Sequence, residues 1–123
     1  MRILIATLLY TGIVVAEENV QEKIKTLDSF YPEKNTSIKY QQEWQMNFYN
    51  ERIEEFKKDP IGQNKIVFLG NSITEGGGDW STRFDVNNIV NRGISGDITE
   101  GILDRLDEII YYKPIAVFLL IGI

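Results

Sequence analysis

The residue best placed for chemistry in this sequence is Ser72. It lies in the segment Gly70–Thr74 (GNSIT), directly after the short apolar run Lys65–Leu69 (KIVFL). An apolar run that ends at a glycine predicts a buried strand, and open parallel sheets bind ligands at the carboxyl ends of their strands. A serine presented there from a tight turn suits a nucleophile whose attack generates an oxyanion. On this loop alone, an ordinary helix N-cap remains the alternative role.

Three other motifs that the glycine-rich loop suggests fail on residue identity. A phosphate-binding loop reads G-x-x-x-x-G-K-[ST], but five residues separate Gly70 from Gly76, and Gly77 stands where the lysine is needed. A dinucleotide-binding loop reads G-x-G-x-x-G, and Ser81 fills its third glycine position after Gly76 and Gly78. The nucleophile elbow G-x-S-x-G fails at position 74, which is a threonine. A nucleotide-binding protein is therefore not favoured.

Apolar periodicity predicts the elements that would position this serine. A helix is expected over Gln41–Lys58, with the core stripe Met46, Tyr49, Ile53 and Phe56. After the first strand we expect a loop over Gly70–Gly78, a short helix or turn over Trp80–Val86 and a strand over Ile89–Asn91. One helix capped by Asp97, with Glu100 at the capping-box spacing, and a strand over Ile115–Ile121 complete the prediction. The last strand is continuously apolar, as in strands buried on both faces of a parallel sheet. Strands that alternate with helices predict an α/β fold.

Two blocks of the sequence resemble the SGNH/GDSL family of serine esterases. Residues 65–74 (KIVFLGNSIT) look like its first block, a strand followed by G-D-S or G-N-S, and residues 91–99 (NRGISGDIT) look like its second block. Residues 103–106 (LDRL), Pro114 and the strand after it resemble the approach to the third block, in the manner of the platelet-activating-factor-acetylhydrolase-like branch. The resemblance covers residues 65–123. It implies a three-layer αβα sandwich with a parallel, flavodoxin-like sheet, truncated after the third strand.

The resemblance also implies roles for individual residues. Ser72 would be the nucleophile, and its backbone N–H would be one oxyanion donor. The backbone N–H of Gly96 would be another, where a glycine lets the backbone approach the substrate closely. Asn71 replaces the commoner aspartate, and Thr74 and Asn91 would hold the loops. The implied reaction is hydrolysis of acyl esters through an acyl-enzyme. Its expected substrates are small acyl esters, such as acetyl groups on carbohydrate or lipid, with no cofactor and no metal.

The departures from the family are larger than the matches. The third block, G-x-N-D, supplies an asparagine oxyanion donor, but the sequence stops at Gly122 and Ile123. The D-x-x-H block, which supplies the base and its orienting acid, is absent, and the sequence contains no histidine. We therefore expect the 123-residue chain itself to be nearly inactive and its last strand to lack a neighbour. The alternative is a non-catalytic exported binding or interaction module, or a decayed gene product, on the same fold.

The N-terminus and the composition set the remaining expectations. Arg2, the apolar run Ile3–Val15 and the small residues before Glu17 predict a secretory signal over residues 1–16. Its removal implies export, periplasmic or secreted, and leaves no stable membrane span. Residues 17–64 would form an N-terminal arm and helix, and residues 65–123 the first part of the hydrolase domain. A net charge of −5 argues against a nucleic-acid partner, and the lack of cysteine excludes disulfides.

Overall fold

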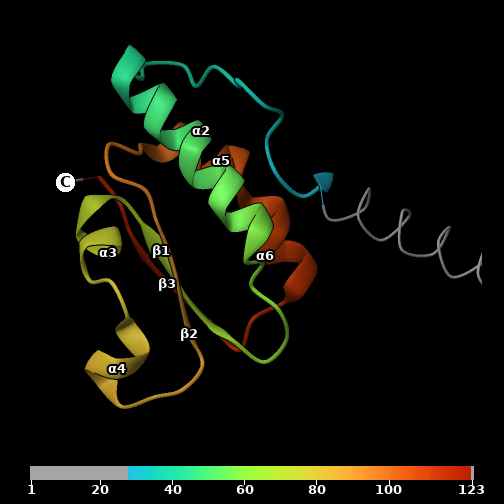
Figure 1. Cartoon of the computed structure of the whole chain (residues 1–123), viewed down its shortest axis with the longest axis vertical. Coiled ribbons are helices and arrows are strands. Elements are labelled where there is room, and N and C mark those ends of the chain that lie inside the picture. Colours follow the sequence, from blue (N-terminus) through green and yellow to red (C-terminus); the bar gives the residue numbers. More distant parts are fainter. Residues whose placement is uncertain (1–27, 123) are drawn as a thin grey trace, which may run out of the picture.

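The structure, a computed structural model, describes residues 28–122 (Figure 1), so the signal predicted over residues 1–16 lies outside the described residues. The elements in chain order are α2 (Glu43–Lys58), β1 (Ile66–Gly70), α3 (Ser72–Gly76), α4 (Trp80–Phe84), β2 (Ile89–Gly93), α5 (Thr99–Asp104), α6 (Leu106–Tyr112) and β3 (Ala116–Leu120). The predicted α/β class is confirmed, because helices and strands alternate from β1 onward.

The three strands form one open, all-parallel sheet in the order β2-β1-β3. Phe68 in the central strand is level with Asn91 of β2 and Phe118 of β3. The chain leaves β1 toward one neighbour through α3 and α4, and it later leaves β2 for the far side of β1 through α5 and α6. Because crossovers between parallel strands are right-handed, this reversal of direction places the two helix pairs on opposite sides of the sheet. Figure 1 shows α2, α5 and α6 on one side, and α3 and α4 on the other.

Helix α2 agrees closely with its prediction. It begins at Glu43, two residues after the expected start, behind a capping box between Gln42 and Gln45, and it ends at Lys58 as expected. Of its apolar stripe, Met46 is half-buried, and the fully buried members are Tyr49, Ile53 and Phe56. These three side chains form a core cluster with residues of the N-terminal arm and the loop after β2. The stripe therefore packs the core, as predicted.

Other boundaries differ from the predictions. The expected loop over Gly70–Gly78 contains a short helix, α3, and the second strand continues through Arg92 and Gly93. The single helix expected after Asp97 is two helices, which meet at Arg105 in a non-helical conformation (φ −117°, ψ 20°). The predicted cap is also wrong, because Ile98 occupies the N-cap position of α5. The carboxylate of Asp97 instead accepts two hydrogen bonds from the Arg105 guanidinium.

The last strand lacks a second neighbour among the described residues, as expected, although its composition is that of a strand buried on both faces. β3 lies at an edge of the sheet, and its residues Val117 to Leu120 are 41–59% exposed. Its continuous apolar sequence has the composition of an inner strand, but only β1 pairs with it in the part of the chain described here. Within residues 28–122, no helix has the length and apolar character needed to span a bilayer.

Candidate functional site

The carboxyl end of β1 leads directly into α3, where Ser72 is the first helical residue. Asn71, and not Ser72, occupies the N-cap position, so the ordinary N-cap role is wrong for this serine. Asn71 and Thr74 are buried, while Ser72 between them is exposed. Its hydroxyl makes no hydrogen bond with any described residue. The loop thus presents one serine side chain to solvent from a backbone that its neighbours anchor.

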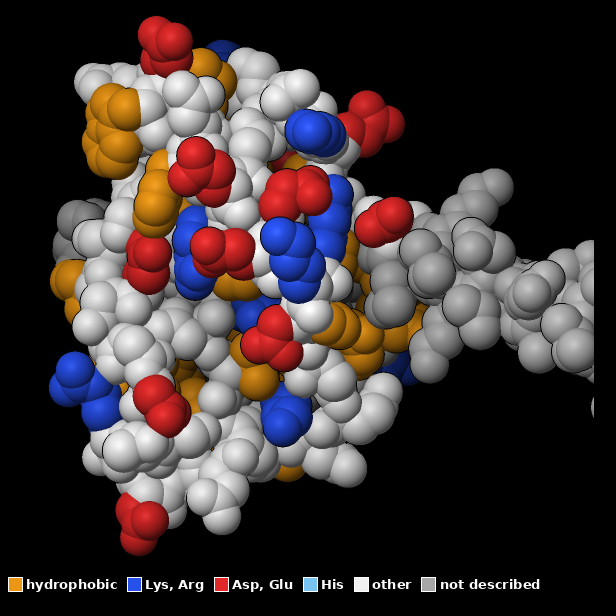
Figure 2. Space-filling model, in the orientation of Figure 1, with side chains coloured by type: hydrophobic (Ala, Val, Ile, Leu, Met, Phe, Trp, Pro, Cys, Tyr) orange, Lys and Arg blue, Asp and Glu red, His pale blue; other side chains and the backbone are white. Residues whose placement is uncertain are grey.

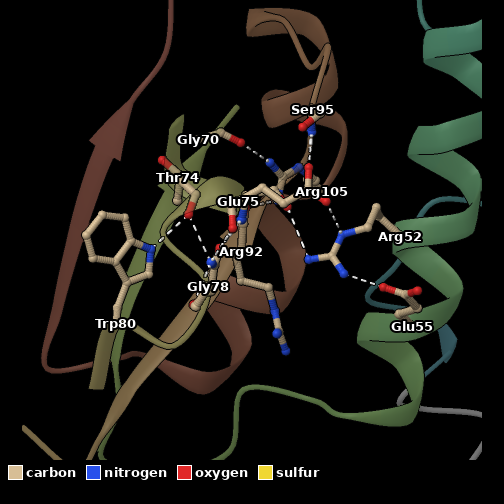
Figure 3. Close-up of polar contacts among 12 residues, drawn as sticks. Arg52, Glu55, Gly70, Thr74, Glu75, Gly78, Trp80, Arg92, Ser95 and Arg105 are labelled. Carbon is tan, nitrogen blue, oxygen red and sulfur yellow. Dashed lines mark hydrogen bonds and ion pairs between the residues drawn. The ribbon is translucent and has the colours of Figure 1, made fainter. Parts of the chain in front are cut away.

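The loop after β2 packs against the same short helix. The backbone N–H of Ile94 donates to the carbonyl of Gly70 at 3.1 Å, and the backbone N–H of Ser95 donates to Oε2 of Glu75 at 2.6 Å. A side chain at Gly93 would collide with the backbone of Glu75, so a glycine is required for this approach. The structure therefore brings the loop that carries Ser72 and the loop that carries Gly96 side by side, with the Ser95–Glu75 contact visible in Figure 3.

The backbone conformation and the neighbours of Gly96 both favour a glycine at this position. Its φ of +79° lies in the left-handed region, and a Cβ atom there would lie 2.9 Å from the Trp44 ring. Its carbonyl accepts a hydrogen bond from Nε2 of Gln45 at 2.9 Å. Contacts with α2 and backbone conformation thus explain this glycine without a substrate. Neither its backbone N–H nor that of Ser72 donates to an acceptor among residues 28–122.

Arg105 joins the ends of the two strands. Its Nη2 donates to the carbonyl of Gly70 at 3.1 Å and its Nη1 to the carbonyl of Arg92 at 2.8 Å. Nε and Nη2 also bind Oδ2 of Asp97 at 3.0 and 2.9 Å, in an ion pair whose side chains are 4% and 0% exposed. Burial raises the pKa of Asp97 and lowers that of Arg105, although each charge opposes the shift of the other. Arg105 therefore fixes both strand ends and the loop between Gly93 and Ile98.

Asn91 closes the far end of α3. Its Nδ2 donates to the carbonyls of Thr74, Glu75 and Gly78 at 2.9, 3.2 and 3.0 Å, and its Oδ1 accepts from Gly93 N–H at 2.9 Å. The Thr74 carbonyl also accepts from the Trp80 indole N–H at 2.8 Å (Figure 3). The prediction that Thr74 and Asn91 hold the loops is confirmed. Asn91 acts through its side chain and Thr74 through its backbone carbonyl.

Sequence reasoning missed Glu75 and Arg52. Nε of Arg52, which reaches in from α2, lies 3.6 Å from Oε1 of Glu75, and the same guanidinium pairs with Glu55 (Figure 3). Glu75 thereby links α2, the short helix after the nucleophile candidate and the backbone of Ser95. No motif marks either residue, because the contact joins segments far apart in the sequence.

A cavity of about 330 Å³ opens at the carboxyl end of the sheet and is lined by Asn71, Asp97, Ile98, Thr99, Glu100 and Gly122. The strand order reverses beside β1 at this position, and open α/β sheets bind ligands at such reversals. Ser72 and Gly96 each lie next in sequence to a residue that lines this cavity, although neither lines it. Within residues 28–122, no group of three His, Cys, Asp or Glu side chains could hold a metal ion.

Neither a scan against models of known protein families nor a search of curated proteins found a match to this chain. Chemically, the site offers an exposed serine hydroxyl, two backbone N–H groups that donate to no described residue, and a cavity beside them that polar side chains help to line. The sequence supplies no histidine to remove the serine proton. The described residues therefore offer a hydroxyl and backbone donors at one end of the sheet, with no histidine in the sequence to act as a base.

Proposed function

We propose that the chain is the N-terminal part of an exported SGNH-type serine ester hydrolase. The observation that carries this proposal is the placement of Ser72, exposed at the carboxyl end of β1 on a loop hydrogen-bonded to the loop of Gly96. Under this proposal, residues 65–123 begin a three-layer αβα sandwich. The two sequence blocks that resemble the family fall on these two loops, which supports the proposal independently of the fold class.

The proposed reaction begins with attack of the Ser72 hydroxyl oxygen on the carbonyl carbon of a small acyl ester. The hydroxyl proton passes to a base, the carbonyl oxygen becomes an oxyanion, and the backbone N–H groups of Ser72 and Gly96 donate to it. Collapse of the tetrahedral intermediate expels the alcohol and leaves the acyl group on Ser72. Water then attacks the acyl-enzyme and releases the acid. Acetyl esters of carbohydrate or lipid are the proposed substrates.

In this scheme Arg105, Asn91 and Glu75 are positioning residues. They hold the backbone from which the hydroxyl and the two N–H groups project, and such preorganised donors act only at the correct distance from the developing charge. The base and its acid would come from a part of the parent protein beyond these residues. The 123-residue chain alone should therefore hydrolyse esters at close to the uncatalysed rate.

Kinetics of the parent protein test the proposal. If the source gene continues the chain through an Asn-Asp pair and a D-x-x-H block, the continued protein should hydrolyse p-nitrophenyl acetate. Ser72→Ala should then lower kcat by about 10³-fold or more, because the members of a triad act as a unit. Ser95→Ala, on the adjacent loop, is the matched control and should keep kcat within about threefold of wild type, because only its backbone N–H contacts Glu75. Full activity in the Ser72→Ala variant would remove the nucleophile assignment.

One observation favours a second candidate, a non-catalytic binding module or decayed gene product on the same fold. The sequence has no histidine, and the Ser72 hydroxyl has no partner among the described residues that would activate it. The codons after Ile123 separate the two hypotheses. An in-frame continuation with the missing blocks supports the esterase, whereas a natural stop codon supports the module.

A further inference from the structure

Helix α2 contacts the loop that carries Gly96 at two points on one of its faces. Gln45 and Arg52 are two turns of the helix apart, so they lie on the same side of it. Nε2 of Gln45 donates to the Gly96 carbonyl at 2.9 Å, and Nη2 of Arg52 donates to the Gly93 carbonyl at 3.3 Å. Both side chains come from outside residues 65–123, the range that resembles the hydrolase family. The helix therefore reaches the candidate site from a part of the chain to which the resemblance assigns no role.

Gly96 lies in a tight turn of four residues. The backbone N–H of Asp97 donates to the carbonyl of Ile94 at 3.0 Å, with Ser95 and Gly96 between them. Gly96 has a φ of +79°, while that of Ser95 is not positive, which is the pattern of a type II turn. The hydrogen bond that closes the turn uses the N–H of Asp97. The N–H of Gly96 is therefore left for an acceptor outside the turn.

The backbone is anchored on both sides of that N–H. On one side, the N–H of Ser95 donates to Oε2 of Glu75 at 2.6 Å (Figure 3). Nε of Arg52 lies 3.6 Å from Oε1 of the same carboxylate, and the two side chains are only 20% and 22% exposed. On the other side, the carbonyl of Gly96 is held by Gln45. The nitrogen of Gly96 thus lies between two anchors, and α2 contributes to both.

Apolar packing makes α2 a firm support for this turn. Between its two polar contacts, the helix buries Tyr49 and Ile53 in one cluster with Ile94, the first residue of the turn. These three side chains are 0, 2 and 0% exposed. The Tyr49 hydroxyl also donates to the carbonyl of Gly101 at 3.0 Å, which ties the helix to α5. A side chain that projects from such a packed element holds its partner more precisely than one from a free loop.

We propose that α2 positions the Gly96 oxyanion donor, with Gln45 and Arg52 as the positioning residues. The inference rests on the proposed ester hydrolysis, in which the N–H of Gly96 donates to the developing oxyanion. Such a donor acts only at hydrogen-bond distance from the oxygen, so a small displacement of the turn weakens it. Gln45 acts through the Gly96 carbonyl, and Arg52 acts through Glu75 and the Gly93 carbonyl. Residues 43–58 then belong to the active-site framework.

Gln45→Glu isolates the first contact. Oε1 of Gln45 accepts from the Gln42 N–H at 2.7 Å, and a carboxylate keeps that capping contact while it replaces the donor to Gly96 by an oxygen. In the continued protein, kcat should fall about tenfold or more with KM within about twofold, because only the transition state loses a contact. Asn47→Asp is the matched control and should leave kcat within about twofold. Asn47 is exposed on the same helix, on a face where acidic and basic side chains interleave (Figure 2).

Arg52→Gln tests the second contact, because it removes the charge that faces Glu75. We expect kcat to fall about fivefold at unchanged KM, and Arg52→Lys to recover most of that loss because it keeps the charge. Glu55→Gln removes the other acidic partner of Arg52 and leaves Glu75 in place. This control should keep kcat within about twofold of wild type. Wild-type kcat in both Gln45→Glu and Arg52→Gln would overturn the inference.

NMR relaxation of the 123-residue chain tests the positioning without catalysis. The order parameter of the Gly96 amide should be about 0.85 in wild type and in Asn47→Asp, and about 0.6 or lower in Gln45→Glu. Far-UV circular dichroism checks that each variant is folded. An order parameter that does not fall in Gln45→Glu would also overturn the inference. If it falls while Ser72→Ala keeps full activity in the continued protein, the proposed hydrolysis fails but the support of the turn by α2 stands.

Discussion

Two five-residue strands, β2 and β3, flank β1 in the same sheet, yet their surroundings differ sharply. Side chains from other segments hold the backbone of β2: Ser81 at its start, and Arg105 at the carbonyl of Arg92 near its end. Among the described residues, β3 pairs only with β1, and four of its five side chains are exposed. The comparison separates the β2 side of the sheet, which side chains of other segments bind and which carries the candidate site, from the β3 side, whose side chains are exposed.

The buried polar interactions described above lie mainly on the β2 side of the sheet. The buried ion pair between Arg105 and Asp97 and the hydrogen bonds of Asn91 all lie on the β2 side of the sheet, around the loops that carry Ser72 and Gly96. A second buried ion pair, Arg92 with Glu108, anchors the end of β2 to α6. The contacts that hold the ends of β1 and β2 are therefore made without any segment packed on the outer side of β3. Substitutions on the two sides should consequently differ in their effect on unfolding.

The largest effect should come from Arg105→Ala. Removing the guanidinium leaves the Asp97 carboxylate buried without its counter-charge, and the Gly70 and Arg92 carbonyls lose a donor. Breaking a buried ion pair in this way lowers the free energy of unfolding by about 3–5 kcal/mol. Urea unfolding followed by circular dichroism measures the loss. Arg83→Ala, at an exposed arginine, should cost about 0.5 kcal/mol, and equal losses would show that Arg105 does not anchor the β2 side.

A smaller loss is expected from Asn91→Ala. Its side chain makes four hydrogen bonds that join β2 to α3 and to the turn at Gly78. Since each net hydrogen bond is worth about 0.5–1.5 kcal/mol and solvent compensates in part, the free energy of unfolding should fall by about 2 kcal/mol. The control is Asn88→Ala, which removes one exposed hydrogen bond to the Asn64 carbonyl. If the Asn88 variant loses as much stability, the loops do not depend on Asn91.

Ser81→Ala should have the smallest effect of the three, and it tests directly what protects the β2 edge. It removes the hydroxyl that occupies the first N–H and carbonyl of β2, so that this edge becomes more like that of β3. We expect a loss of about 1 kcal/mol and faster amide hydrogen exchange at Ile89, measured by NMR. Ser95→Ala serves as the control. Unchanged exchange at Ile89 would mean that the hydroxyl does not protect the edge.

Periodicity predicted the elements well where packing follows local sequence. The stripe in α2 and the apolar run that becomes β1 were sufficient to predict these two elements, since both contribute apolar residues to the core clusters. The apolar composition of β3 alone predicts burial on both faces, and the expectation that it lacks a neighbour came from the family resemblance, which places a further strand beside it. The break at Arg105 was missed, because a buried pair formed with Asp97 in the loop after β2 replaces helical continuity there.

The candidate site could be located but not completed from sequence. The strand followed by GNS predicted where Ser72 would lie, and its exposure agrees with a position on a presented loop. The loop contacts made by Glu75 and Arg52 were hidden, since they join α3, α2 and the backbone of Ser95 through tertiary packing. The requirement for glycine at position 96 was expected for substrate approach. The structure adds a left-handed φ and contact with Trp44, neither of which leaves a sequence signature.

The two tryptophans of the chain give each of these loops its own fluorophore. Trp80 donates its indole N–H to the Thr74 carbonyl, two residues after Ser72, and its ring packs against Phe68 and Phe84. Trp44 is 57% exposed, and its ring fills the space that a Cβ atom at position 96 would need. The apolar surroundings of Trp80 favour emission at shorter wavelength than the solvated ring of Trp44. Intrinsic fluorescence of single-tryptophan variants would therefore report separately on the serine loop and the glycine loop, without any added label.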